Sequence, residues 1–227
     1  MGGEVISMNR MVDAFAAAQR MMDELAHYGF NRADLANEVE SGCCLPWGMW
    51  WRCGASRVVI GDELEDYVLK IAFTQDYEKY NQREVEVYQR AVEEGLEDNF
   101  AWCACYLEPY TEEGVYFPGI YVMERLDGTE DEVYDSAWVY GYQQYCKVCN
   151  WDYTDFSHAS DYNSWSGRNY EDDDDLLDYL TSFIKELNVV RKFYRFIEDE
   201  RVNDLHRGNF LFRKERLVIC DYAGWNW

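Results

Sequence analysis

The chain has 227 residues, of which 48% are hydrophobic, so it can bury a substantial core as one two-lobed domain or as two small domains. Its 44 acidic and 21 basic residues give a formal net charge of −23, and so acidic a surface repels nucleic-acid phosphates and anionic membranes. We therefore exclude direct binding to either. A basic partner is favoured instead, either a cationic small molecule or the basic surface of a protein.

The first predicted element is an amphipathic helix in MVDAFAAAQRMMDELAHYGF, within an N-terminal helical extension over residues 1–40. Charged residues such as Asp13 and Arg20 interrupt the stretch, so we expect neither a secretory signal nor a membrane span, and we expect a cytoplasmic protein. The helix is expected to pack on the segment that follows, or alternatively to cap another protein. Its apolar stripe consists of Met11, Phe15, Met22 and Leu25.

Two elements with clear periodicity follow. YVLKIAF alternates apolar residues around a single lysine, Lys70, which predicts a strand. NQREVEVYQRAVEEG has helical periodicity and places Val85, Tyr88 and Val92 on one face. Beyond a further apolar stretch, GIYVMERLDG, the composition changes.

Residues 128–175 are rich in Tyr, Asp, Ser and Trp, with a helical middle and a polar, loop-like end. This segment is either part of a ligand pocket or a surface insertion, and the sequence favours neither. An amphipathic helix is predicted next, in LLDYLTSFIKELNVVRKFYRFIED, with an apolar stripe from Leu176 to Ile197.

Near the carboxyl end, NDLHRGNFLFRKERLVICDYAGW contains three oxygen-bearing side chains in one pattern. Asp204 and Asn209 lie five residues apart on a predicted turn, after which a strand, a charged hairpin and a second strand lead to Asp221. The strand tips are expected to present these side chains to one cleft. Phosphoryl transfer needs such a set, because its catalysis is mostly positioning and neutralisation of phosphate charge by Mg²⁺ held on carboxylate and amide oxygens.

The block DLHRGN…VICDYAG resembles the catalytic and metal-binding loops of the protein kinase-like superfamily. This superfamily includes protein kinases, aminoglycoside and choline phosphotransferases, and small kinase-like proteins of bacteria and phages. The triplet Asp-Leu-His is closer to the small-molecule phosphotransferases. The resemblance implies an α+β class and a minimal two-lobed protein kinase-like fold with a truncated C-lobe. The N-lobe would span residues 41–126, and the reduced C-lobe, residues 127–227, would carry the insertion 128–175 and the catalytic and metal loops at 202–223.

The same resemblance implies a role for each motif residue. Asp204 becomes the candidate catalytic base, and Asn209 and Asp221 become candidate ligands of Mg²⁺. Lys70 would meet the α- and β-phosphates of ATP. Glu84 is its expected partner, and Glu86 is the alternative.

A nucleotide pocket is implied upstream of that block. Backbone groups from Glu124 to Leu126 would pair with adenine at the hinge between the lobes, and Met123 would line the back of the pocket. The glycine-rich loop is reduced to Gly54, with the small residues Ala55 and Ser56 beside it, which still leaves room for backbone amides to approach phosphate.

Several positions depart from the family pattern. Val202 and Asn203 replace the His and Arg of protein kinases, so activation by phosphorylation of a loop is not expected. Ala223 stands where the family has glycine, so the backbone after Asp221 is expected to turn less freely. The sequence ends at Trp227, so the resemblance leads us to expect a fold without the usual platform for protein substrates.

Cysteine spacing offers a separate hypothesis. Cys103 and Cys105 share one face of a predicted strand, and Cys146 and Cys149 have the spacing of zinc ligands on a helix, so the four could form a thiolate site. Neither pair has the flanking residues of a zinc ribbon. We therefore expect reduced, buried thiols.

The sequence thus predicts an ATP- and Mg²⁺-dependent phosphotransferase acting on an unidentified acceptor, for which a cationic small molecule is one class. One alternative is a kinase-like pseudoenzyme that acts by binding. The other is an acidic inhibitor, of a kind that phages encode, that occupies the basic surface of a nucleic-acid-binding protein.

Overall fold

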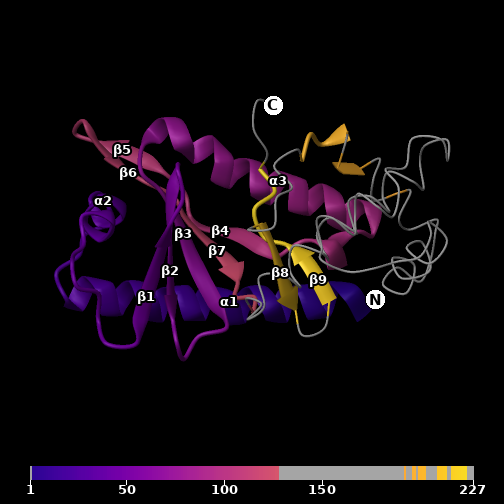
Figure 1. Ribbon diagram of the computed structural model, residues 1–227, viewed down its shortest axis with the longest axis horizontal. Helices are drawn as coiled ribbons and strands as arrows, with labels where there is room; N and C mark the ends of the chain where they lie inside the picture. Colours follow the sequence, from indigo (N-terminus) through magenta and orange to yellow (C-terminus); the bar gives the residue numbers. More distant parts are fainter. Residues whose placement is uncertain are drawn as a thin grey trace, which may run out of the picture. The chain divides into compact units, whose positions relative to one another are not determined.

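The computed structural model describes residues 2–127, 192, 196–197, 199–202, 209–213 and 216–223. The chain divides into two compact units, Met1–Leu126 and Asp127–Trp227, and we describe each by itself. The first unit combines helices with a mainly antiparallel sheet (Figure 1), so the predicted α+β class is confirmed.

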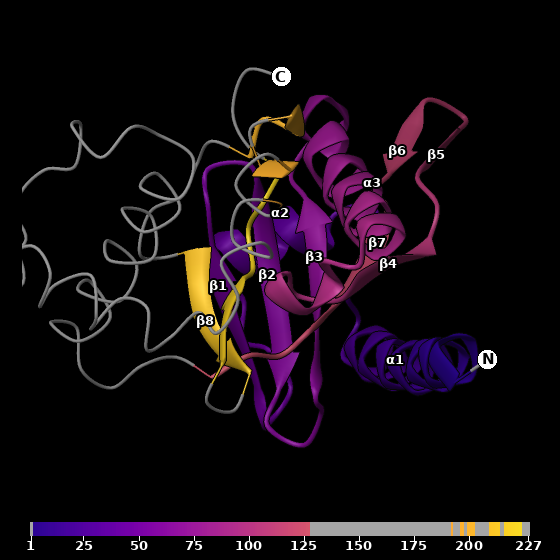
Figure 2. The same ribbon diagram turned by 90° about the vertical axis from the view of Figure 1, so that its right-hand side faces the viewer.

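A five-stranded sheet forms the centre of the first unit. In spatial order its strands are β1 (Met49–Cys53), β2 (Arg57–Asp62), β3 (Tyr67–Ala72), β7 (Ile120–Glu124) and β4 (Cys103–Leu107), and all neighbours are antiparallel. The strand predicted around Lys70 is β3, the middle strand of the five, and it is buried along most of its length. In the chain, β4 and β7 are connected by a hairpin of β5 (Tyr110–Glu112) and β6 (Val115–Phe117), which projects beyond the sheet (Figure 2).

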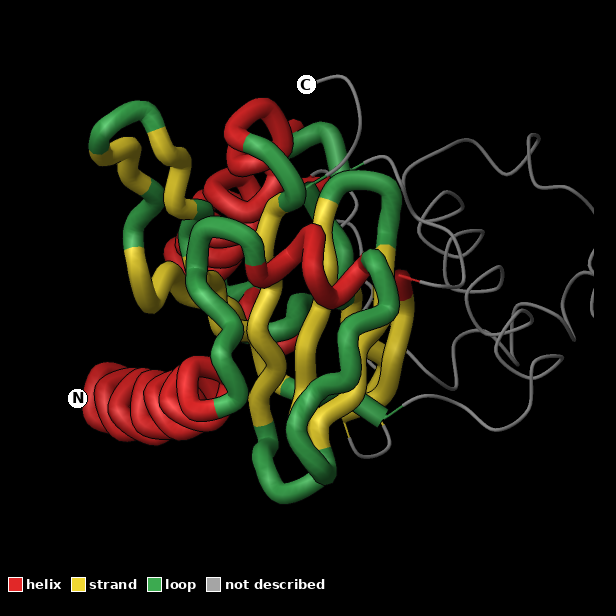
Figure 3. The backbone as a smooth tube through the Cα atoms, turned by 90° about the vertical axis from the view of Figure 1, so that its left-hand side faces the viewer, coloured by secondary structure: helices red, strands yellow, loops and turns green. Residues whose placement is uncertain are grey.

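Helices cover both faces of this sheet. α1 (Gly2–His27) and α2 (Leu35–Glu40) lie on one side and α3 (Glu78–Glu94) lies on the other (Figure 3). Successive strand residues point to opposite faces, so Leu69 and Ile71 enter the apolar core with α1 and α2 while Lys70 points to α3. The 3₁₀ turns η1 (Gln75–Tyr77) and η2 (Glu97–Asn99) flank α3.

α1 packs on the sheet, as predicted, but mostly through small side chains. The expected stripe is wrong at Met11, which is 41% exposed. At that end of the helix Arg10 turns toward the sheet instead, where it pairs with Glu124 and lies 5.6 Å from the centre of the Trp102 ring. Alanine lets a helix backbone approach a sheet closely. The fully buried row is Ala14, Ala17, Ala18, Met21 and Leu25.

α3 presents a polar row to the sheet, which the apolar periodicity did not predict. Val92 is 48% exposed and Val85 and Tyr88 are half-buried, so the predicted face was wrong. The sheet face beneath α3 carries the basic side chains of Arg57 and Lys70, and the Gly119 amide lies just before β7, so acidic and amide groups of α3 find donors there. The buried row is Glu78, Asn81, Glu84, Val87 and Ala91.

The second unit contains the predicted hairpin, with β8 (Phe210–Arg213) paired to β9 (Arg216–Ile219). Asp127 joins it through two backbone hydrogen bonds of 2.9 Å with Phe212. The segment 128–175 and most of the amphipathic helix predicted after it lie outside the described residues. In the part of the chain that the structure describes, none of the helices has the length and apolar character that a membrane span requires.

The alanine row makes α1 sensitive to added volume. Ala18→Leu is expected to lower the free energy of unfolding by about 1–3 kcal/mol, because Ala18 is fully buried against the sheet. Ala16→Leu, on the exposed side of the same helix, is expected to change it by less than about 0.5 kcal/mol. Urea denaturation of both variants measures the difference, and equal losses would contradict this packing.

Candidate functional site

The centre of the candidate site is a buried ion pair between β3 and α3. The ammonium of Lys70 donates to both carboxylate oxygens of Glu84, at 2.8 Å each. Both residues are almost inaccessible, Lys70 at 4% and Glu84 at 2% exposure. The predicted contact between these residues is therefore present, and the nucleotide-binding role that the resemblance gives them stays a prediction.

The alternative partner for Lys70 was wrong. The side chain of Glu86 is 63% exposed and pairs with Arg83 at 3.5 Å on the outer surface of α3. Helix geometry explains the choice, because residues two apart on a helix point to different sides. Glu84 faces the sheet, so Glu86 cannot.

A third charged residue, Arg57, completes this cluster and was missed by the sequence analysis. Its guanidinium donates to Glu84 Oε1 at 2.7 Å and to Asn81 Oδ1 at 3.0 Å, and Arg57 is only 5% exposed. The strand register contained the signal: Val59 is paired with Lys70, so Arg57, two residues before Val59, shares the face of Lys70.

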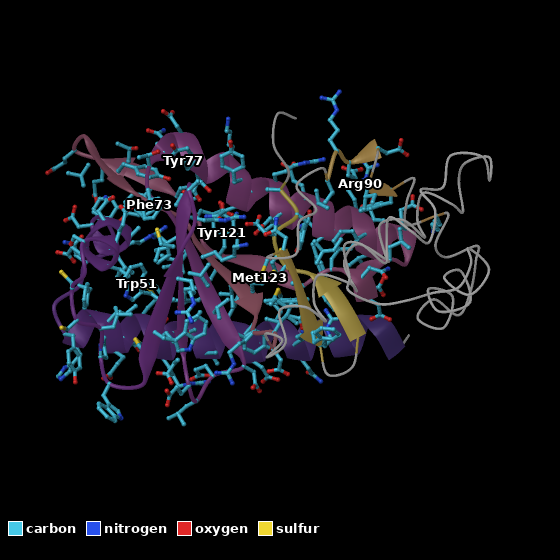
Figure 4. The ribbon with its side chains drawn as sticks, in the orientation of Figure 1. Trp51, Phe73, Tyr77, Arg90, Tyr121 and Met123 are labelled. Atoms are coloured by element: carbon cyan, nitrogen blue, oxygen red, sulfur yellow. The ribbon has the colours of Figure 1, made fainter. Side chains whose placement is uncertain are left out.

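Met123 lies directly against this cluster. Its sulfur is 3.9 Å from the Lys70 ammonium, and the side chain is 3% exposed. Tyr121 and Met123, two residues apart on β7, therefore share the face of the sheet that α3 covers (Figure 4).

The backbone amides at the end of β7 differ in whether they already donate a hydrogen bond. The Glu124 amide donates to Trp102 O at 2.9 Å, and the Arg125 amide donates to Asp66 O at 2.8 Å. The amide of Leu126 donates to no acceptor within the described ranges. Of the backbone amides from Glu124 to Leu126, that of Leu126 is therefore the one without an acceptor in the described part of the chain.

The carboxylate of Glu124 braces this strand end. Its Oε1 accepts from the Trp102 amide at 2.9 Å, and its Oε2 pairs with Arg10 of α1. The side chain thus has a structural task, and an adenine would have to meet the backbone here.

Gly54 lies in an exposed, tight turn between β1 and β2. Its amide donates to Arg57 O at 3.0 Å, and a Cβ at this position would meet that same oxygen at an ordinary 3.8 Å. The turn itself therefore does not require glycine. Whether Gly54 approaches phosphate remains a prediction.

In the second unit, the hairpin brings Asn209 and Asp221 to one end. Asn209 directly precedes β8, and Asp221 follows β9 by two residues. The Cys220 amide donates to Asn209 O at 2.9 Å, which closes this end of the hairpin. Asn209 is buried and Asp221 half-buried. The third member of the predicted set, Asp204, lies outside the described residues.

The polar row of α3 continues at its N-terminal end with Glu78. This carboxylate accepts from the Gly119 amide at 3.2 Å and from the Tyr116 hydroxyl. Burial, and then the hydrogen bond to Glu78, raise the pKa of the Tyr116 phenol well above its ordinary range. Burial, and then the charge of Glu78, do the same to the pKa of Tyr121. Burial, followed by the charge of Glu108, raises the pKa of the Cys105 thiol to about 12.

The thiols form no metal site among the residues that can be placed, where no cluster of metal-binding side chains occurs. Cys103 and Cys105 do share one face of β4. On the neighbouring strand β7 they are paired with Met123 and Tyr121, respectively. Cys146 and Cys149 lie outside the described residues.

No protein-family model and no curated protein sequence matches this chain. Among solved structures, the streptomycin–ATP complex of APH(2″)-IIa, an aminoglycoside phosphotransferase, is similar at 13% identity and a TM-score of 0.36, covering 77% of this chain and 65% of that one. A second APH(2″) protein, in complex with GDP and kanamycin, has 12% identity and a TM-score of 0.39, over 82% and 70% of the two chains.

A protein from Haemophilus somnus 129PT described as a fructosamine-3-kinase has 9% identity and a TM-score of 0.35, over 92% of this chain and 74% of its own. These similar structures are members of the protein kinase-like superfamily.

The ion cluster predicts an order of stability losses. Glu84→Gln weakens the acceptor of both Lys70 and Arg57, and we expect it to lower the free energy of unfolding by about 3–5 kcal/mol. Lys70→Met should cost less, since Arg57 still reaches Glu84. Glu86→Gln, the surface control, should change stability by less than about 0.5 kcal/mol. Guanidinium denaturation gives the order, and a loss for Lys70→Met equal to that for Glu84→Gln would contradict the three-residue arrangement.

The raised pKa values predict instability in alkali. A phenol or thiol whose pKa is raised by folding stabilises the native state fully below its unfolded pKa, and that contribution is lost as the pH rises toward the folded value. The free energy of unfolding should therefore fall above about pH 9. Tyr121→Phe should make that fall shallower, whereas Tyr28→Phe, at an exposed position, should leave it unchanged. Denaturation curves collected from pH 8 to pH 11 would detect the difference, and identical slopes would refute it.

Proposed function

We propose that this chain is an ATP- and Mg²⁺-dependent phosphotransferase of the kinase-like type, transferring a phosphoryl group to a hydroxyl of its acceptor. The observation that carries the proposal is the buried Lys70–Glu84 pair on β3 and α3, with Met123 against it. Lys70 would hold the phosphates of the nucleotide, and Glu84 would hold Lys70 in place.

Stability alone does not account for this pair. Burying two charged groups costs several kcal/mol each in desolvation, and replacing a buried ion pair by apolar side chains is often neutral or stabilising. Here the cluster lies next to an otherwise apolar core that fills the opposite face of the sheet. A lysine held in one position by its partner can bind an anion such as phosphate. A phosphate-binding role therefore explains a buried ion pair that stability does not require.

The purine is assigned to the end of β7. Met123 would line the back of its pocket, and the Leu126 amide is the donor available to a ring nitrogen. The amides of Glu124 and Arg125 already donate to Trp102 O and Asp66 O. One backbone donor and one carbonyl acceptor are enough to orient a purine, so the Leu126 amide would suffice as the donor.

Asn209 and Asp221 would hold Mg²⁺ from the end of the β8–β9 hairpin. Carboxylate and amide oxygens are the ligands that this ion takes in proteins, and the hairpin supplies one of each. Bound there, the ion would neutralise phosphate charge during transfer. Asp204 is proposed as the base that orients the acceptor hydroxyl and takes its proton.

The acceptor class that we propose is a cationic small molecule. A chain with a net charge of −23 attracts cations from solution and raises their local concentration. Two of the similar structures are complexes with streptomycin and kanamycin, which agrees with this class without identifying the compound. We also propose a location in the cytoplasm, where ATP is available.

A binding protein without catalysis is the second candidate. The observation that favours it is the turn at Gly54, which lacks the further glycines of a phosphate-binding loop and is closed on itself by the hydrogen bond to Arg57. Such a pseudoenzyme would bind nucleotide or a basic protein surface and would transfer nothing.

Thermal unfolding with and without ATP and Mg²⁺ tests nucleotide binding. A ligand at a hundred times its Kd stabilises the native state by about 2.7 kcal/mol, which raises Tm by several degrees for a chain of this size. We expect that rise in the wild type, and we expect Asp221→Asn and Lys70→Met to lose most of it relative to their own ligand-free Tm.

The matched control for Asp221→Asn is Asp76→Asn, which removes the same charge from an exposed position. It should keep the full rise. No rise for the wild type at millimolar nucleotide would rule out the phosphotransferase, and a rise that persists in Asp221→Asn without turnover of ATP would favour the second candidate.

A further inference from the structure

We propose that Arg57 is a positioning residue of the nucleotide site, which holds α3 in place so that Glu84 stays on Lys70. The effect of Arg57 on nucleotide binding rests on the function proposed above. Its contacts with α3 are those described for the first unit. Arg57 is the first residue of β2, and the sequence pattern did not predict a role for it.

The guanidinium grips α3 at two points of one face. Asn81 and Glu84 lie three residues apart, so their side chains are neighbours on the helix. Asn81 Oδ1 accepts from Nη1 at 3.0 Å, and Glu84 Oε1 accepts from Nη2 at 2.7 Å. All three side chains are buried, with Asn81 fully inaccessible. A planar fork with two buried acceptors fixes direction as well as distance.

This grip determines where the Glu84 carboxylate points. Oε1 accepts from both Arg57 and Lys70, and Oε2 accepts from Lys70. With Oε1 fixed by β2, the carboxylate keeps its second oxygen toward β3. A single Lys70–Glu84 contact would leave the helix free to roll about that point, and the Asn81 contact, most of a turn away, opposes the roll.

A further contact anchors the same row of the helix. Glu78, three residues before Asn81, accepts from the Gly119 amide. A Cβ at Gly119 would lie 2.4 Å from Glu78 Oε1 and 2.5 Å from the Tyr121 ring, so these side chains would have to shift to admit it. Three successive positions of one helix face are thus tied to three strands or their ends. The position of α3 is set by buried contacts within the first unit, and no modification is needed to bring Glu84 to Lys70.

Hydrogen–deuterium exchange tests the grip directly, because it reports α3 separately from the sheet. The variants are Arg57→Gln, which removes the charge, and Arg57→Lys, which keeps the charge and loses the fork. Arg52→Gln is the matched control, since Arg52 lies exposed on the neighbouring strand β1. All are compared well below their Tm, by mass spectrometry of peptides from α3 and from β3.

A hydrogen bond to a charged group is equivalent to roughly ten- to a hundredfold in an equilibrium constant. We therefore expect Arg57→Gln to speed exchange in residues 78–94 by about tenfold or more, with a smaller change in β3. Arg57→Lys should retain part of the protection, and Arg52→Gln should behave as the wild type. In parallel, Mg·ATP should bind Arg57→Gln at least about tenfold more weakly.

Two results would overturn the proposal. One is exchange in α3 that is unchanged in Arg57→Gln, or that rises only in step with β3, which would make Arg57 a general stabiliser. The other is full protection in Arg57→Lys, which would show that the fork is unnecessary. If wild-type protein fails to bind Mg·ATP, the proposed function fails, and the exchange in α3 still decides whether Arg57 grips the helix.

Discussion

The first unit depends on one buried carboxylate. Glu84 accepts hydrogen bonds from Lys70 of β3 and Arg57 of β2, and it belongs to a helix that covers the sheet. Its charge is what permits two cations to be buried at 4% and 5% exposure, and its helix places it within reach of both strands. The geometry of β2, β3 and α3 is therefore fixed by electrostatics on this face. On the opposite face, where α1 and α2 pack, it is fixed by apolar contact.

This division of the sheet explains why sequence patterns predicted some features and missed others. The strand around Lys70 was predictable because its apolar residues alternate, and the same alternation separates Lys70 from Leu69 and Ile71. The helix that carries Glu84 was predictable in extent, but its buried face was not, because that face is partly polar. Periodicity of apolar residues cannot identify a helix side that is buried by ion pairing.

Two other features required the tertiary structure. Arg57 could be assigned only when the register of β2 against β3 was known, since one residue of slip would turn its side chain to the apolar face. Part of the buried face of α1 was missed because large apolar residues were assumed to mark the buried stripe. Leu25 is in the core as predicted, but Ala14 and Ala18 belong to it too, and Met11 does not. In the second unit, the hairpin between Asn209 and Asp221 was foreseen from its turn and strand residues.

The contrast between the two faces of the sheet also bears on how such a chain can change over time. On the α1 side, substitutions in the core alter volume and shape. On the α3 side, a change of charge at Arg57, Lys70 or Glu84 alters the partners of the other two, so these positions can be exchanged only together. We expect related chains to exchange apolar residues of similar size on the first face while keeping the second as a linked set. A family sharing this site could then diverge until overall sequence identity is low, with three coupled positions as its remaining signature.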